Sequence, residues 1–78
     1  MKSYQNLGGD SGIVAYDYDS QTIKVKFHDG AVYEYKSSVI GLYNFRQMIV
    51  LAESGHGLHS FIMRNREIRK GFSNKYIA

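Results

Sequence analysis

The stretch TIKVKFHDGAVYEYK, residues 22–36, determines the fold expected for this chain. Apolar and polar residues alternate strictly from Thr22 to His28, which is typical of a half-buried strand. Asp29-Gly30 then favours a hairpin, because glycine accepts the positive φ that a tight turn needs. The returning strand is expected from Ala31 to Ser37. The sequence therefore predicts two paired antiparallel strands.

Two registers of this hairpin place the tyrosines of the second strand differently. A two-residue turn pairs Lys26 with Tyr33 and sets Tyr33 and Tyr35 beside Lys24 and Lys26, because directly paired residues share a face. A loop longer by one residue sets both tyrosines among the apolar residues of the first strand. We favour the longer loop, because the opposite face of the second strand (Val32, Glu34 and Lys36) makes a poor core. The two tyrosines are then predicted as core, and the alternative is a platform on which bases stack.

The remaining elements complete an α+β domain. Residues 13–18 are rich in aliphatic and aromatic side chains and predict a strand before the hairpin. A first helix is expected over residues 39–53 and a second from residue 59 or 60 to residue 70. The predicted fold is a three-stranded antiparallel β-meander followed by two α-helices packed on one face.

The first predicted helix is apolar over much of its circumference. Its core stripe is expected to be Val39, Leu42, Phe45, Ile49 and Ala52, at spacings of three and four. Three further apolar residues lie off that stripe: Ile40, Tyr43 and Val50. Because an exposed apolar surface usually marks a contact surface, we expect a protein partner or a homo-oligomer.

The hairpin motif resembles a known family. Tyr16-Asp17, followed by Gln21-Thr22-Ile23-x-Val25-x-Phe27-x-x-Gly30-x-x-Tyr33-x-Tyr35, is similar to the KTSC domain, whose hallmark is the central Tyr-x-Tyr. That domain occurs at the C-terminus of some lysyl-tRNA synthetases and as stand-alone bacterial or phage proteins. The resemblance covers residues 11–72 and implies a small α+β fold. The family's function is not established, and RNA binding has been suggested from the synthetase context.

Composition bounds the class of protein. Seventy-eight residues make at most one domain, expected at residues 11–72 between a flexible arm at 1–10 and a tail at 73–78. The chain has no cysteine, which fits a reducing compartment. Its apolar runs are too short to span a bilayer, so no membrane association and a cytoplasmic location are expected.

Positive charge is concentrated near the C-terminus. Residues 61–78 contain five basic residues and one acidic residue, a net charge of +4, whereas residues 1–60 carry a net charge of −1. Such a segment favours an anionic partner, although a solvated helix face has the same composition. The candidate phosphate-binding residues are Arg64, Arg66, Arg69, Lys70 and Lys75, with Lys24 and Lys26 assisting. Arg66, Arg69 and Lys70 are expected to share one outer helix face.

No pattern in the sequence predicts catalysis. His56 and His59 lack a third ligand nearby, so neither a metal site nor another cofactor is expected. The glycine-containing loop of residues 54–60 follows a helix rather than a strand, which excludes a dinucleotide fingerprint but still allows phosphate to meet a helix N-terminus. Function therefore stays open between a non-enzymatic nucleic-acid-binding module and a protein-interaction module, such as a bacterial or phage accessory or inhibitor protein.

Overall fold

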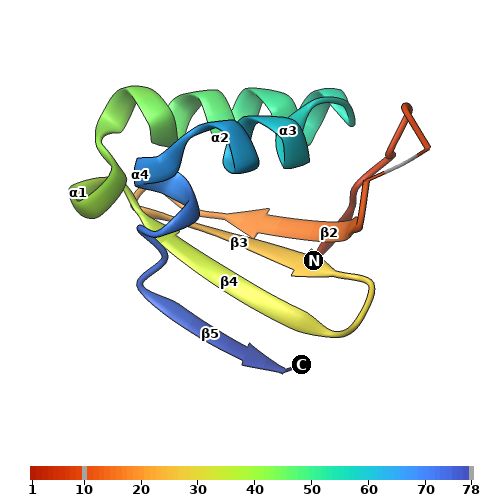
Figure 1. Ribbon diagram of the computed structural model, residues 1–78, viewed down its shortest axis with the longest axis horizontal. Helices are drawn as coiled ribbons and strands as arrows, with labels where there is room; N and C mark the ends of the chain where they lie inside the picture. Colours follow the sequence, from red (N-terminus) through yellow and green to blue (C-terminus); the bar gives the residue numbers. More distant parts are fainter. Residues whose placement is uncertain (10, 78) are drawn as a thin grey trace.

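The structure is an antiparallel sheet covered on one face by helices. It is a computed structural model that describes residues 1–9 and 11–77. Within them, five strands follow the order β1 (Lys2–Ser3), β2 (Ile13–Tyr18), β3 (Thr22–Phe27), β4 (Ala31–Lys36) and β5 (Asn74–Ile77). The helices of the described residues are α1 (Ser37–Ile40), α2 (Leu42–Ser54), α3 (Leu58–Arg64) and α4 (Arg66–Arg69). Figure 1 shows all four helices on the same side of the sheet. The predicted α+β class is confirmed.

The sheet extends beyond the predicted meander at both edges. The meander of β2, β3 and β4 is confirmed, but Lys2 and Ser3 add a strand next to β2. At the other edge, β5 pairs with β4. The predicted arm is therefore wrong for residues 2 and 3, and the predicted tail is wrong for residues 74–77. A three-stranded meander leaves both outer strands with unpaired backbone groups, and these short polar segments satisfy them. Asp10 and Ala78, which belong to the predicted arm and tail, lie outside the described residues.

The hairpin adopts the longer of the two registers. Ile23 lies opposite Tyr35 and Val25 opposite Tyr33, so the tyrosines share a face with the apolar residues of β3. Gly30 has φ 91°, and the Asp29 carboxylate accepts a hydrogen bond from the Ala31 amide at 3.0 Å. The loop between Phe27 and Ala31 is one residue longer than a two-residue turn, and the preference for the longer loop is confirmed.

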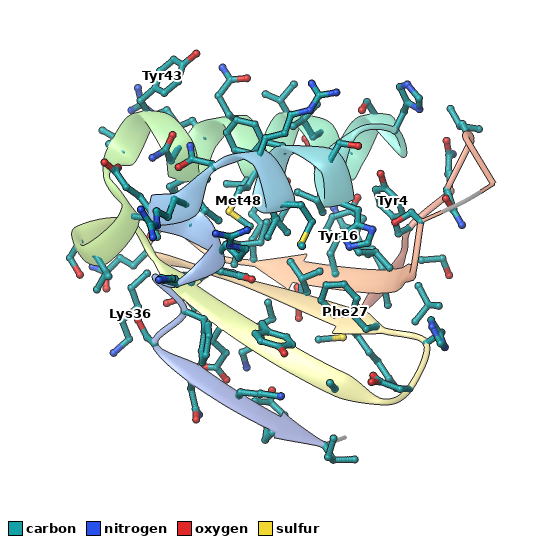
Figure 2. All side chains as sticks on the ribbon, viewed as in Figure 1. Tyr4, Tyr16, Phe27, Lys36, Tyr43 and Met48 are labelled. Carbon is teal, nitrogen blue, oxygen red and sulfur yellow. The ribbon has the colours of Figure 1, made fainter. Side chains whose placement is uncertain are left out.

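The core lies between the sheet and the helix layer. Tyr35 is 2% exposed, and Ile13, Ile23 and Val25 are fully buried beside it. From the helices, Met48, Leu58 and Ile68 are fully buried in the same cluster. Figure 2 shows Met48 and Tyr16 between the two layers, whereas Tyr43 points away from both.

The first predicted helix is divided at Gly41, which changes the residues it buries. Gly41 has φ 90° and ψ 149°, and it separates α1 from α2. A helical period cannot continue through such a conformation, so residues before and after it face different directions. Val39 and Leu42, predicted as core, are exposed, and Ile40, predicted off the stripe, is buried. Phe45 and Ala52 are buried as predicted, and Ile49 packs against the core while partly buried.

The second predicted helix is also divided. Asn65 has φ −101° and ψ 102°, an extended conformation that ends α3 and begins α4. The Asn65 carbonyl accepts hydrogen bonds from the amides of Ile68 and Arg69, so it starts a new short helix. The single helix expected up to Lys70 is therefore wrong, and the cations near it are distributed over two helices.

Candidate nucleic-acid interface

The structure separates the predicted cations between the two faces of the sheet. Lys24 and Lys26 lie on the face opposite the helices, because they alternate with the buried Ile23 and Val25. The Lys24 ammonium lies 3.9 Å from the Glu34 carboxylate, so its charge is partly balanced. These two lysines are not brought together with the basic residues of the C-terminal segment.

The other cations belong to the C-terminal part of the chain, on α3, α4 and β5. Lys75 lies opposite Tyr33 in the sheet and therefore shares the helix-side face, with its Nζ 5.1 Å from the centroid of the Tyr33 ring. Arg64 and Arg69 each line a pocket on this side. We call the surface formed by His59, Arg64, Arg69 and Lys75 the basic edge. Arg66 and Lys70 are exposed but do not line either of these two pockets.

The first pocket of the basic edge is rich in rings, and we call it the aromatic pocket. Its volume is about 360 Å³. The lining residues that matter here are Phe27, Tyr33, Tyr35, His59, Arg69 and Phe72. It lies between the hairpin, α3 and the segment that leads from α4 to β5. An arginine beside several rings can hold a flat anionic ligand by stacking and by charge.

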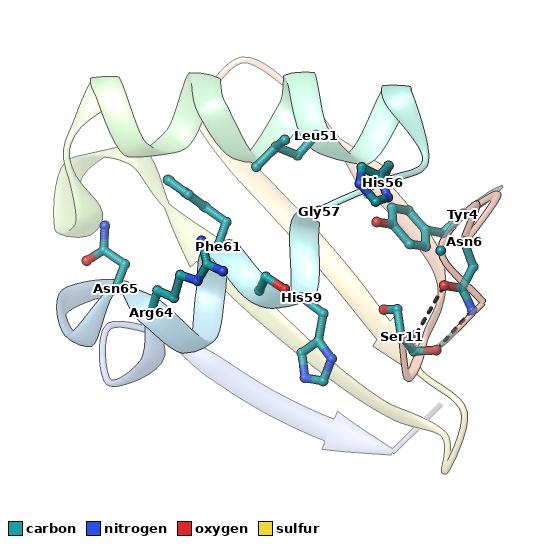
Figure 3. Close-up of a pocket in the computed structure, with 12 residues that line it drawn as sticks. Tyr4, Asn6, Ser11, Leu51, His56, Gly57, His59, Phe61, Arg64 and Asn65 are labelled. Atoms are coloured by element: carbon teal, nitrogen blue, oxygen red, sulfur yellow. Dashed lines mark hydrogen bonds between the residues drawn. The ribbon is translucent and has the colours of Figure 1, made fainter.

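The second pocket is more polar and has a volume of about 620 Å³; we call it the polar pocket. Its main polar lining residues are Tyr4, Asn6, Ser11, His56, His59 and Arg64. Figure 3 shows His59 and Arg64 on α3, while Tyr4 and Asn6 approach from the N-terminal segment. The Asn6 side chain exchanges hydrogen bonds with the Ser11 backbone at 3.0 and 3.2 Å, which fixes this wall. His59 lines both pockets and therefore joins them.

Tyr4 changes the interpretation of the glycine-containing loop. Its side chain is 6% exposed, and its hydroxyl accepts a hydrogen bond from the Leu58 amide, at the start of α3, at 3.2 Å. The first amide of this helix is thus already satisfied by the protein. A phosphate at this helix start would therefore lack that donor. Arg64 lines the same pocket as His56 and Gly57 of the loop.

The two motif tyrosines have different environments. Tyr35 belongs to the core, as predicted, and burial raises the pKa of its hydroxyl to about 12 because the charged phenolate is poorly solvated there. Tyr33 is only partly buried and packs at the margin of the core. The prediction of core tyrosines is therefore confirmed for Tyr35, whereas Tyr33 presents part of its ring to the aromatic pocket.

The described residues lack two other kinds of feature. Among residues 1–9 and 11–77, no group of three or more histidines, cysteines or acidic residues is arranged to hold a metal ion. Within the same part of the chain, every helix is too short or too polar to cross a membrane.

Comparison with known proteins adds no relative. None of the family models, curated proteins or solved structures compared with this chain matches it. The likeness of the Tyr33-x-Tyr35 hairpin to the KTSC domain therefore stays a hypothesis.

Three residues of these pockets, Tyr4, Asn6 and His59, carry no signal in the sequence that would predict their place. Tyr4 and Asn6 lie in a polar, glycine-containing segment that has no periodic pattern. The sequence places His59 only near the start of a helix, and its position between two pockets depends on how α3 packs on the sheet. Phe72 follows Gly71, where a chain is expected to fold back after a helix; it does so onto Tyr33, with the ring centroids 5.0 Å apart.

Proposed function

We propose that this chain is a non-enzymatic module that binds single-stranded nucleic acid, with RNA as the preferred ligand, along its basic edge. The observation that carries the proposal is the alignment of Arg64, Arg69 and Lys75 with two pockets that share His59. Proteins that bind single strands combine cations that follow the phosphates with rings that stack the bases. The basic edge and the aromatic pocket together offer both kinds of group on one side of the sheet.

Two further features support this choice of ligand. The net positive charge of the chain lies in the segment that supplies the basic edge, which favours encounter with a polyanion. The resemblance to the KTSC domain, for which RNA binding has been suggested, agrees with it. A cytoplasmic location is part of the proposal, because the chain contains no cysteine and RNA is abundant there.

The test is a salt titration of binding to a fluorescently labelled single-stranded RNA, followed by anisotropy. We expect the parent protein to bind at low salt and to weaken steeply as salt rises. The variant Arg64→Gln/Arg69→Gln should bind more weakly to every RNA sequence, because phosphate contacts carry no sequence information. Its log–log salt slope should become shallower by about 0.7 for each phosphate that the variant no longer neutralises.

The matched control removes two charges from the other face of the sheet. Lys24→Gln/Lys26→Gln has the same change in net charge but leaves the basic edge intact, so it should bind nearly as tightly as the parent. Equal weakening by both double variants would mean that only net charge matters, and no specific interface would exist. A parent protein that binds neither RNA nor the matching DNA at low salt would refute the proposal.

A second candidate function is supported by a different surface. Val39, Leu42, Tyr43 and Val50 on α1 and α2 are 52% to 73% exposed, and we call them the exposed apolar patch. Tyr43 and Val50 lie two turns apart on one face of α2. Exposed apolar side chains of this size are typical of a protein-interaction surface. If this patch mediates self-association, the association should change little with salt in sedimentation velocity, whereas RNA binding at the basic edge should weaken steeply.

A further inference from the structure

The aromatic pocket contains a continuous series of rings. The rings of Phe72 and Tyr33 have centroids 5.0 Å apart, Tyr33 and Phe27 are 5.5 Å apart, and Phe27 and His59 are 5.7 Å apart. Each pair meets edge to face, at interplanar angles of 74° to 87°. Edge-to-face contacts of this kind favour a defined orientation of each ring relative to its neighbour.

Phe72 differs from Phe27 and Tyr33 in lying outside the hydrophobic core. It is 40% exposed and is not a member of the buried cluster, although it lines the aromatic pocket. A large ring that remains so exposed contributes less to folding than a buried one, and its open surface is available to a ligand.

The surroundings of the pocket specify the chemistry of that ligand. The volume of about 360 Å³ lies near the lower end of the range for small-molecule sites, which suits one flat ring system. Arg69 lines the pocket, and the Lys75 ammonium lies over the Tyr33 ring beside it, so an anionic group attached to the flat ring meets two cations. Asp29 also lines the pocket, and one of its oxygens accepts from the Ala31 amide at 3.0 Å.

We infer that the aromatic pocket takes one unstacked base of the bound strand, with Phe72 as the ring that stacks on it and Arg69 and Lys75 on the adjoining phosphates. This inference rests on the proposed function and adds the contact that reads the base. The second oxygen of the Asp29 carboxylate can accept a hydrogen bond from an exocyclic amino group of a base, whereas its charge repels a phosphate.

The test combines removal of the ring with removal of the bases in one double-mutant cycle. The parent and Phe72→Ala are titrated with a short single-stranded RNA and with an abasic oligomer of the same length and charge. For RNA, Phe72→Ala should lose about 5- to 150-fold in affinity, the loss that follows from removing one stacked ring. For the abasic oligomer the two proteins should bind equally. The salt slope of the variant should match that of the parent, because the variant keeps every cation that meets a phosphate.

Two controls separate stacking from a change in the fold. Phe72→Tyr keeps the ring and should retain the affinity of the parent. Tyr43→Ala removes an exposed ring of α2 that lines neither pocket and should also bind like the parent. The melting temperature of each variant is measured alongside.

Each outcome decides between the proposals. If Phe72→Ala binds RNA as tightly as the parent does, the inference is overturned while the proposed function stands. If Phe72→Ala weakens RNA and the abasic oligomer equally, the ring contacts no base, and the inference again fails. If the parent binds neither ligand at low salt, the proposed function and the inference fail together, and a protein side chain becomes the better candidate for the pocket.

Discussion

Truncation of Tyr35 tests whether the central motif residue holds the fold together. The ring is 2% exposed and lies opposite Ile23, beneath the helix layer. Replacing a buried aromatic ring with alanine costs about 3–5 kcal/mol, the sum of lost burial and a residual cavity. A domain of this length has a free energy of unfolding of about 4–12 kcal/mol, so Tyr35→Ala removes a large share of it. We expect the melting temperature to fall by about 12 °C or more.

The variant Tyr35→Phe separates the ring from its hydroxyl. Tyr35 lines the aromatic pocket. Within the described ranges no buried side-chain nitrogen or oxygen lacks a hydrogen-bond partner, so the Tyr35 hydroxyl is not an unsatisfied buried group. Removing the hydroxyl should therefore change the free energy of unfolding at pH 7 by less than about 1 kcal/mol.

We expect the free energy of unfolding of the parent and that of Tyr35→Phe to respond differently to high pH. Burial raises the pKa of Tyr35 to about 12, above its ordinary value of 10.0. Between pH 10 and pH 12 the unfolded chain ionises at this residue and the folded chain does not, so the stability present below pH 10 is progressively lost. The loss is on the order of 2–3 kcal/mol. Tyr35→Phe should lack this component of the alkaline decrease.

The assay is urea unfolding followed by far-ultraviolet circular dichroism, at pH 7 and at intervals up to pH 12. Linear extrapolation gives the free energy of unfolding of each variant. A Tyr35→Ala protein that has the melting temperature of the parent but no longer binds RNA would refute the assignment of Tyr35 to the core. Tyr35 would then be part of a stacking surface.

Three other parts of the molecule can be tested by substitution. Gly55→Ala should lower the melting temperature more than Gly41→Ala does. Both glycines have positive φ, but an added Cβ at Gly55 would lie 2.6 Å from a neighbouring side-chain carbon, whereas nothing lies within 4 Å at Gly41. Equal decreases in melting temperature would contradict this. Tyr4→Phe leaves the first amide of α3 without its acceptor and should cost about 1–3 kcal/mol in urea unfolding. If the exposed apolar patch mediates self-association, Tyr43→Lys/Val50→Lys should convert an oligomer to a monomer in sedimentation velocity, and a parent that is monomeric at high concentration would exclude it.

The sequence alone predicted the centre of the sheet. Strict alternation from Thr22 to His28, the Asp29-Gly30 turn and the charges of Glu34 and Lys36 were enough to predict the hairpin and its register. Val32, which was grouped with Glu34 and Lys36 as a poor core face, is fully buried. These signals are local, because side-chain alternation and turn geometry depend on residues close together in the chain. The charge asymmetry that places cations in residues 61–78 is equally visible in the sequence.

The helix faces and the two edge strands were decided by the tertiary structure. The positive φ of Gly41 interrupts the helical period. Next to it, Val39 and Leu42 are exposed and Ile40 is buried, the reverse of the expected pattern. Asn65 divides the second helix and sends Arg64 and Arg69 to different pockets. Strands β1 and β5 carry no alternation of their own and form because β2 and β4 each offer an unpaired edge.

The candidate interface was predictable in its charge but not in its shape. Cations can be counted along a chain, whereas a pocket needs side chains from separate segments to converge on one surface. His59, Tyr33 and Phe72 are distant in sequence and line one pocket only because α3 and the segment after α4 pack on the same face of the sheet. Lys24 and Lys26, which the sequence grouped with the other cations, were placed on the opposite face by the two-residue period of β3. Local patterns fix which way a side chain points within its own element, and only the packing of elements fixes what it points at.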